Sequence, residues 1–293
     1  MFITSLFDVN DLEKMKEAGV GAVVVGTENF TIASPSCLND KDLKILVMKA
    51  HELKMEVHVL CNRILFDEDI PELMKYLGYL KEIEVDVIYY GDVAVYTLGK
   101  ELDLLDKLIF MPGFILTNPQ DVKAYLKQGI QRVEIANELT LEEKIAISDT
   151  CPKQVQVVLH GYLMMSYSRR EFMSNYFSEI EHVGNPKSDF NYYLVEETRE
   201  HSMPILETEY GTMIYSPYVL KSFHEIKRLS EKVSYFRIDG LFLEQAYILD
   251  VVKAYKRILA GDDEIEVEKE FIEKYPNLVH ESGFYYQKTN LVK

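Results

Sequence analysis

The chain has 293 residues, 47% of them hydrophobic, and a formal net charge of −16. This length allows one large core, and the acidic balance argues against strong nucleic-acid binding by this chain alone, because phosphates are neutralised by clustered Lys and Arg. Cys37, Cys61 and Cys151 give neither a disulfide framework nor a CxxC metal motif. Since no apolar run approaches the roughly 18 residues of a membrane helix and no signal peptide is recognised, we expect a cytoplasmic protein without membrane contact or a bound metal.

Short apolar runs rich in β-branched and aromatic residues recur along the chain, as buried parallel strands do. They cover residues 2–5, 19–25, 55–60, 85–90, 107–111, 129–135, 155–159 and 233–238. Helical stretches with N-capping signals lie between them. These signals are Asn39 before residues 40–53, Asn118-Pro119, Thr140 with Glu143, and Ser216-Pro217. The alternation predicts an α/β fold, a (β/α)8 TIM-like barrel, with a doubly wound open sheet as the alternative.

One connection is far longer than an ordinary loop between a strand and a helix. Residues 161–215 separate the seventh strand, which ends near His160, from a helix expected to begin at Pro217. This long insertion could contain a hairpin formed by residues 192–195 and 203–206, and we interpret it as a lid or a packing element. We therefore expect a barrel over residues 1–261, which includes this insertion, and a C-terminal helix and tail over residues 262–293 packed on it.

Polar residues at the carboxyl ends of the expected strands are the candidates for chemistry, because barrel enzymes place their sites there. His160, Asp92 and Asn62 are the catalytic candidates, and Arg237, Asp239, Tyr167 and Glu138 are the candidates for substrate binding. His160 precedes Gly161, which lets backbone approach closely, and Arg237 could hold a carboxylate with two hydrogen bonds. A structural histidine and an ion pair inside the barrel are the alternatives.

Other chemistry finds less support in the sequence. His58 and Cys61 lie three residues apart on one strand, and alternation sends their side chains to opposite faces. A joint metal site is therefore not expected. The sequence contains no GxSxG, HExxH, P-loop or GxGxxG motif, and none of the cysteines has the local context of a protease nucleophile.

The stretch from Val157 to Arg170, V-V-L-H-G-Y-L-M-M-S-Y-S-R-R, resembles the signature of the collagenase-like peptidases, family 32 of the unclassified peptidases. Weaker likenesses follow in the same order as in the family. They are residues 21–26, Asn62, Asp92, residues 136–140, residues 237–240, residues 255–257 and Gly283-Phe284. The ordered set spans nearly the whole chain, and the resemblance implies a barrel fold.

Compared with the family pattern, this chain lacks the signature cysteines. Met164 stands where the family has a signature cysteine, the sequence reads Arg170-Glu171 where a second is expected, and residues 182–187 contain none. Relatives with these cysteines can hold a 4Fe–4S cluster, which takes about four thiolates. Asn137 also replaces the family's usual arginine. We therefore expect no cofactor in this chain and an iron–sulfur cluster, if one is used, in a partner.

Some relatives act in pairs in oxygen-independent hydroxylation, including that of wobble uridine in tRNA with prephenate as the oxygen donor. The resemblance implies a cysteine-poor subunit that forms 5-hydroxyuridine together with a cysteine-bearing paralogue, contacts tRNA, and holds a small carboxylate substrate near Arg237 and His160. Residues 164–176 would form the lid or the partner face. A collagenase-like peptidase and a non-catalytic scaffold subunit remain the alternatives.

Overall fold

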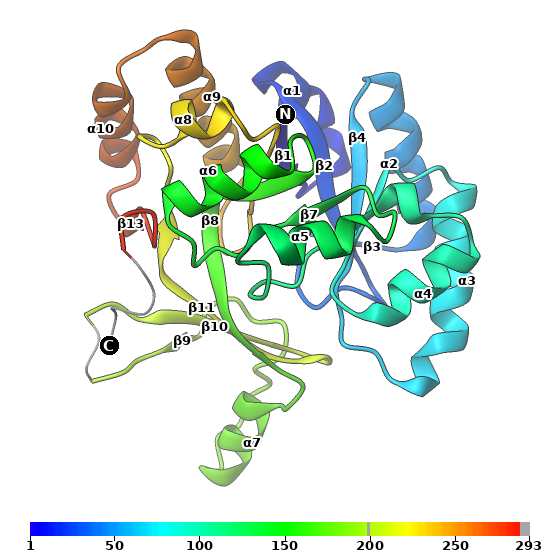
Figure 1. Ribbon diagram of the computed structural model, residues 1–293. Coiled ribbons are helices and arrows are strands. Elements are labelled where there is room, and N and C mark those ends of the chain that lie inside the picture. Colours follow the sequence, from blue (N-terminus) through cyan, green and yellow to red (C-terminus); the bar gives the residue numbers. More distant parts are fainter. Residues whose placement is uncertain (198–199, 288–293) are drawn as a thin grey trace.

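The computed structural model describes residues 1–197 and 200–287. Its central feature is a closed ring of eight parallel strands, because the last strand pairs with both the first and the seventh (Figure 1). In chain order the ring consists of β1 (Phe2–Ser5), β2 (Val20–Thr27), β4 (Glu56–Cys61), β5 (Val87–Tyr90), β6 (Leu108–Phe110), β7 (Arg132–Glu134), β8 (Val155–Ser168) and β12 (Tyr235–Ile238). The expected (β/α)8 barrel is confirmed, and the open sheet is excluded.

Helices cover the outside of the ring and follow its strands in turn (Figure 1). They are α1 (Leu12–Ala18), α2 (Asp40–Glu52), α3 (Ile70–Glu82), α4 (Val93–Glu101), α5 (Pro119–Leu126), α6 (Leu141–Thr150), α8 (Ile226–Ser230) and α9 (Gln245–Ala260). The predicted caps Asn39, Asn118 and Thr140 each accept a hydrogen bond from the first turn, which is typically worth about 1 kcal/mol. Short 3₁₀ turns cover Val9–Asp11, Asp67–Asp69 and Leu105–Lys107.

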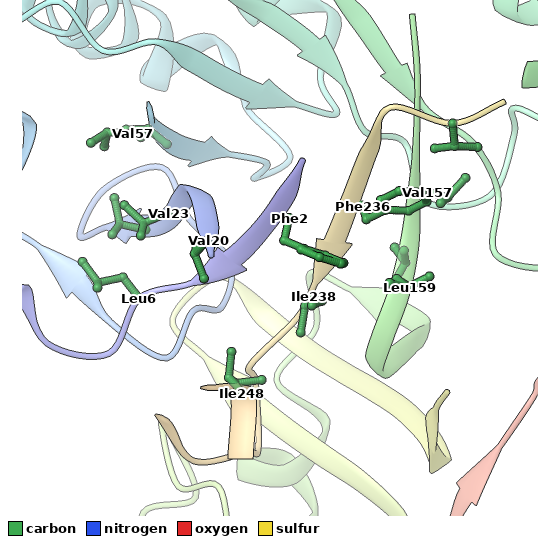
Figure 2. Packing of buried hydrophobic residues seen from close by; sticks show 14 of the residues in the cluster. Phe2, Leu6, Val20, Val23, Val57, Val157, Leu159, Phe236, Ile238 and Ile248 are labelled. Atoms are coloured by element: carbon green, nitrogen blue, oxygen red, sulfur yellow. The ribbon is translucent and has the colours of Figure 1, made fainter. Parts of the chain in front are cut away.

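Alternation along the strands divides the core into two layers. One face of each strand packs against the helices, as Phe2, Phe236 and Ile238 do beside Ile248 of α9 (Figure 2). The other face fills the barrel with a smaller apolar cluster. Its members are Ile3, Ala22, Val24, Leu60, Val87, Tyr89 and Ile109. The barrel is thus a packed core whose usable space lies at its mouth.

The long insertion is an antiparallel sheet that grows out of the barrel wall. Strand β8 runs on to Ser168 and pairs with β11 (Gly211–Leu220), which pairs with β10 (Met203–Thr208) and through it with β9 (Tyr193–Leu194). The hairpin expected near residues 192–195 and 203–206 is therefore present, although residues 198–199 at its turn lie outside the described part. Helix α7 (Phe172–Glu179) stands at the far end of the insertion (Figure 1).

The prediction of a helix that begins at Pro217 is wrong, because this residue lies within strand β11. The pairing register with β8 shifts between Tyr215 and Val219, so the missing N–H of the proline falls at an irregularity where no regular ladder bond is lost. Ser216 acts there as a bridge, since its hydroxyl accepts from the backbone of Leu163 at 3.0 Å. The cap-then-proline signal therefore marks a strand bulge here.

The C-terminal segment packs on the barrel in two places. Helix α10 (Glu264–Lys274) lies along α9 and buries Val267 and Phe271. Strand β13 (His280–Glu281) then adds to β11 in parallel. The short strand β3 (Cys37–Leu38) similarly adds to β2. Among the described residues, no helix is both long and apolar enough to cross a bilayer.

Candidate functional site at the barrel mouth

The carboxyl ends of the barrel strands open into a cavity of about 480 Å³. Apolar side chains of the strands, including Val24, Leu60 and Val158, form part of its lining near the barrel core. Tyrosines of the insertion, Tyr162 and Tyr215 among them, line another side. Burial raises the pKa of Tyr162 to about 12, so the phenol is neutral at physiological pH and can act as a hydrogen-bond donor. The insertion therefore forms part of the cavity wall.

A buried ion cluster forms the polar part of the cavity floor. Arg237 donates from Nε and Nη2 to the two carboxylate oxygens of Glu134, at 2.6 and 2.9 Å, and from Nη1 to Asp239 at 2.5 Å. Burial opposes the charge on Arg237, but the two carboxylates outweigh it and raise its pKa above the usual range. The cluster contains one positive and two negative groups, so its formal charge is −1.

Glu134 was not among the candidates from the sequence, although a signal for it existed. It lies on β7 between Val133 and Ile135, which face outward, and alternation therefore points its carboxylate into the barrel. A charged residue on the inner face of a buried strand needs partners. Glu134 finds them in Arg237 and in Gln156, which donates from Nε2 at 2.8 Å.

Asp92 and Asn62 line the cavity, and both also hold loops in place. Asp92 caps helix α4 by accepting from Ala94 at 2.9 Å, and its other oxygen accepts from the backbone of Leu65 at 3.0 Å. Asn62 accepts from the backbone of Ile32 at 3.2 Å through its Oδ1. The carboxylate of Asp92 is therefore fixed by two backbone donors, whereas the amide Nδ2 of Asn62 has no hydrogen-bond partner among the described residues and can serve a ligand.

Arg63 joins the insertion to the barrel loops. It is 8% exposed and donates to the backbone oxygen of Asn29 at 2.5 Å and to the carboxylate of Asp69. Its guanidinium also lies over the ring of Tyr210, 4.3 Å from the ring centroid. Tyr167 lines the cavity and donates to the backbone oxygen of Tyr210 at 2.9 Å. These contacts hold the insertion against the loops that follow β2 and β4.

Two candidates from the sequence lie outside the cavity. Glu138 is exposed in the turn before α6 and does not line it. His160 is fully buried between the barrel and α9, where Nδ1 lies 3.0 Å from the hydroxyl of Tyr255 and Nε2 lies 2.7 Å from that of Tyr247. The expected position of His160 at the mouth is therefore wrong.

A β-bulge explains why His160 points outward. On the neighbouring strand Arg237 pairs with Val158 and Ile238 pairs with His160, so Leu159 is an extra residue in β8. A bulge of this kind reverses the alternation beyond it. Gly161 allows the close approach, since its φ is +126° and a Cβ there would lie 2.6 Å from the backbone oxygen of Asp239. A simple count along the strand does not reveal this extra residue.

The cysteines do not fit an iron–sulfur cluster. Cys61 and Cys151 are buried on different elements, one at the end of β4 and the other after α6, and Cys37 is exposed on β3. Burial raises the pKa of the Cys61 thiol to about 12, which keeps it protonated and a poor ligand. Across residues 1–197 and 200–287, no three His, Cys, Asp or Glu side chains are arranged to hold a metal ion. Met164 lines the cavity with a thioether in place of a thiolate.

The fold and the mouth define a (β/α)8 barrel protein whose site lies beneath a β-sheet insertion. The family model described as Peptidase family U32 matches residues 7–291, and the chain belongs to this family.

Three curated relatives illustrate the range of the family. The chain is 26% identical to tRNA hydroxylation protein P2 of Bacillus subtilis (strain 168), over 95% of each chain. It is 21% identical to tRNA hydroxylation protein P1 of the same organism, over 92% of this chain and 67% of the relative. It is 22% identical to a collagenase of Porphyromonas gingivalis (strain ATCC BAA-308 / W83), over 83% of this chain and 61% of the relative.

Proposed function

We propose that this protein is a subunit for tRNA hydroxylation and takes part in forming 5-hydroxyuridine at the wobble position. The observation that carries the proposal is the similarity to tRNA hydroxylation protein P2, which extends over 95% of both chains. The lack of a thiolate set fits a subunit that leaves redox chemistry to a partner. In this proposal the partner is a cysteine-bearing paralogue that carries the iron–sulfur cluster, and the pair acts in the cytoplasm.

The cavity is the proposed place for the small reactants. Its tyrosine and phenylalanine side chains offer apolar ring faces, and the free amide nitrogen of Asn62 offers a donor. Aromatic faces suit a planar ring, as bases bound by proteins often stack on them. The floor cluster has a formal charge of −1, so a neutral ring is accommodated there at a smaller electrostatic cost than a further anion.

A carboxylate substrate such as prephenate would reach Arg237 by replacing Asp239. Glu134 holds the guanidinium with two bonds and its side chain is 5% exposed, whereas Asp239 holds it with one bond and its side chain is 27% exposed. The less buried carboxylate with one contact is the easier one to displace. We therefore assign Asp239 as the exchangeable counter-ion and Glu134 as the permanent one.

The proposed partner surface is the outer face of α7. Phe172, Tyr176 and Ile180 recur at every fourth residue and are 47%, 61% and 50% exposed, and the nearby Val183 is 96% exposed. Side chains spaced by four lie along one side of a helix. Contiguous exposed apolar surface commonly marks a protein interface. The same helix is anchored at its N-terminus, where the buried Glu207 accepts from the backbone of Met173 at 2.7 Å.

The first experiment measures modified nucleosides. Deleting the gene is expected to remove 5-hydroxyuridine from tRNA digests analysed by mass spectrometry, and the intact gene supplied in trans is expected to restore it. Unchanged nucleosides in the deletion strain would refute the proposal. If alanine at both Asn62 and Arg237 leaves complementation intact while the protein is still required, the scaffold alternative is correct.

The second experiment tests the partner surface with two isoleucines. Ile180→Glu at the C-cap of α7 is compared with Ile265→Glu on α10, which is 66% exposed and lies at the opposite end of the molecule from α7 (Figure 1). After co-expression with the cysteine-bearing paralogue, size exclusion and iron analysis are expected to show a brown complex for the wild type and Ile265→Glu. Ile180→Glu should elute alone and colourless. Equal complex formation by both variants would remove α7 from the interface.

The peptidase alternative finds less support at the mouth. Ser5 and Ser34 line the cavity, but no histidine, cysteine or lysine of the described residues does. A serine nucleophile needs an adjacent base to take its proton. Cleavage of casein by the purified protein, abolished by Ser34→Ala, would favour this alternative.

A further inference from the structure

A chain of hydrogen bonds runs through the barrel interior beneath the cavity. It begins at Glu56 on β4, whose Oε2 lies 2.8 Å from Nε2 of His58. Nδ1 of His58 lies 3.1 Å from the hydroxyl of Tyr89, which lies 2.9 Å from Oε1 of Gln156. Nε2 of Gln156 then reaches Glu134 at 2.8 Å. His58, Tyr89 and Gln156 are fully buried, so water does not substitute for the contacts among these three residues, whereas the side chain of Glu56 is 43% exposed.

The direction of each bond follows from the two carboxylate ends. Glu134 is ion-paired with Arg237 and accepts, so Gln156 turns its NH₂ toward Glu134 and its carbonyl toward Tyr89. The phenol of Tyr89 has one proton, and burial keeps its pKa above the usual range. That proton is committed to Gln156. The oxygen of Tyr89 must therefore accept from His58, and Nδ1 of His58 carries a proton.

At the Glu56 end of this hydrogen-bond chain, the number of protons determines whether the contact between Glu56 and His58 is a hydrogen bond. The hydrogen bond with His58 lowers the pKa of Glu56, whose carboxylate also accepts. With Nδ1 already protonated, a neutral imidazole would turn a bare Nε2 toward a carboxylate, and two acceptors would face each other at a fully buried ring, although the side chain of Glu56 is itself 43% exposed. We propose that the Glu56–His58 pair retains one additional proton at neutral pH, and that His58 is a positioning residue that holds Glu134 beneath the cavity through Tyr89 and Gln156.

Charged groups around His58 act in both directions. Burial lowers the pKa of the imidazole, Glu56 and Asp86 raise it, and Arg132 on β7 lowers it further. The N-terminal amine acts on the pair through Glu56, whose pKa it lowers. Retention of the proton therefore depends on the directions of the hydrogen bonds along the chain rather than on the surrounding charges. As the pH rises through the apparent pKa of the pair, the proton leaves and the chain loses one bond.

The chain orients Glu134 rather than conducting protons to the cavity. A phenol or an imidazole can accept a proton on one side and release one on the other. The amide of Gln156 lies between Tyr89 and Glu134 and has no proton to release at ordinary pH. The protonation of His58 is independent of the proposed function, whereas its positioning role rests on that function.

The test begins with the unaltered protein. Long-range proton–nitrogen NMR of the seven imidazoles, with His58 assigned by loss of its signals in His58→Gln, reports which ring nitrogens carry protons. A protonated Nδ1 at pH 7 is expected, with a second proton on Nε2 or on the carboxyl of Glu56. A bare Nδ1 with the only proton on Nε2 would overturn the proposal.

Two tyrosines on the same strand provide matched variants. Tyr89→Phe removes the acceptor of His58, and Tyr90→Phe removes a hydroxyl from the opposite face of β5, where it bonds to no other described residue. Tyr89→Phe is expected to shift the titration of His58 to lower pH and to reduce 5-hydroxyuridine several-fold. Tyr90→Phe should change neither. Identical His58 titrations in both variants would overturn the inference. A 5-hydroxyuridine content of tRNA that does not depend on this gene would remove only the proposed function.

Discussion

His58 and His160 are both fully buried in the barrel wall, and both ring nitrogens of each are hydrogen bonded. His58 faces the barrel interior, where its chain of partners ends on a carboxylate at each end. His160 faces outward and lies between the phenols of Tyr247 and Tyr255. A neutral imidazole satisfies two phenols, since one nitrogen donates and the other accepts, and burial lowers the pKa of His160 well below its usual value. The partners, rather than burial alone, therefore distinguish a proton-holding histidine from a structural one.

The largest expected change in unfolding free energy comes from breaking a buried ion pair, compared with an exposed ion pair of the same geometry. Glu134 binds Arg237 with two bonds inside the barrel, and Glu142 binds Arg228 with two bonds at the surface. Glu134→Gln should lower the free energy of unfolding by about 3 kcal/mol, because weaker amide contacts replace two charge-assisted hydrogen bonds to a buried guanidinium that Asp239 still neutralises. Glu142→Gln should change it very little, since solvent screens the pair. Urea denaturation measures both variants, and equal losses would contradict the buried role of Glu134.

The next effect tests the bulge that turns His160 outward. Gly161→Ala places a Cβ 2.6 Å from the backbone oxygen of Asp239 at a φ of +126°, and should destabilise the protein by about 1–3 kcal/mol. Gly78→Ala in α3 meets no atom within 4 Å and should stabilise it by up to about 1 kcal/mol. Thermal unfolding under identical conditions gives the two shifts. A neutral Gly161→Ala would show that the bulge tolerates a side chain.

The low pKa values of two histidines, His160 and His280, also predict that the folded protein loses stability in acid. Burial lowers the pKa of His160, and it lowers that of His280 to about 4. Below the unfolded value near 6.5 the unfolded chain binds protons that the folded protein does not, so stability falls as the pH drops from 6.5 toward 4. The slope is at most about 1.4 kcal/mol per pH unit for each group. Denaturation of His160→Gln across this range should show a shallower slope than the wild type, whereas the exposed His182→Gln should match it.

Sequence patterns predicted the parts of this fold that depend on local chemistry. All eight strands follow the apolar runs, and Thr140 with Glu143 forms the expected capping box. Arg237 and Asp239 meet at the mouth because both lie at the end of one strand. These features depend on alternation and on nearby residues, which a single sequence displays.

The misplaced features depend on register between distant strands. Leu159 becomes an extra residue only through its pairing with β12, and this turned His160 away from the site. Pro217 lies in strand β11 because β8 extends beyond the barrel and pairs with residues of β11 on both sides of the proline. The partnership of Glu134 with Arg237 joins residues 103 positions apart. Neither composition nor local spacing contains this information.

The smallest expected change in stability concerns Asp239, the partially exposed member of the floor cluster. Asp239→Asn should cost less than about 1 kcal/mol in unfolding free energy, because Glu134 keeps both of its bonds to Arg237. If Asp239 is the counter-ion that a carboxylate substrate displaces, the variant should bind prephenate about fivefold more tightly, which corresponds to roughly 1 kcal/mol. Isothermal titration calorimetry with Glu138→Gln as the control outside the cavity measures this. Weaker binding by Asp239→Asn than by the control would mean that the carboxylate of Asp239 itself holds the ligand. Arg237 would then stay paired with its carboxylates, as Arg228 stays paired with Glu142 at the surface.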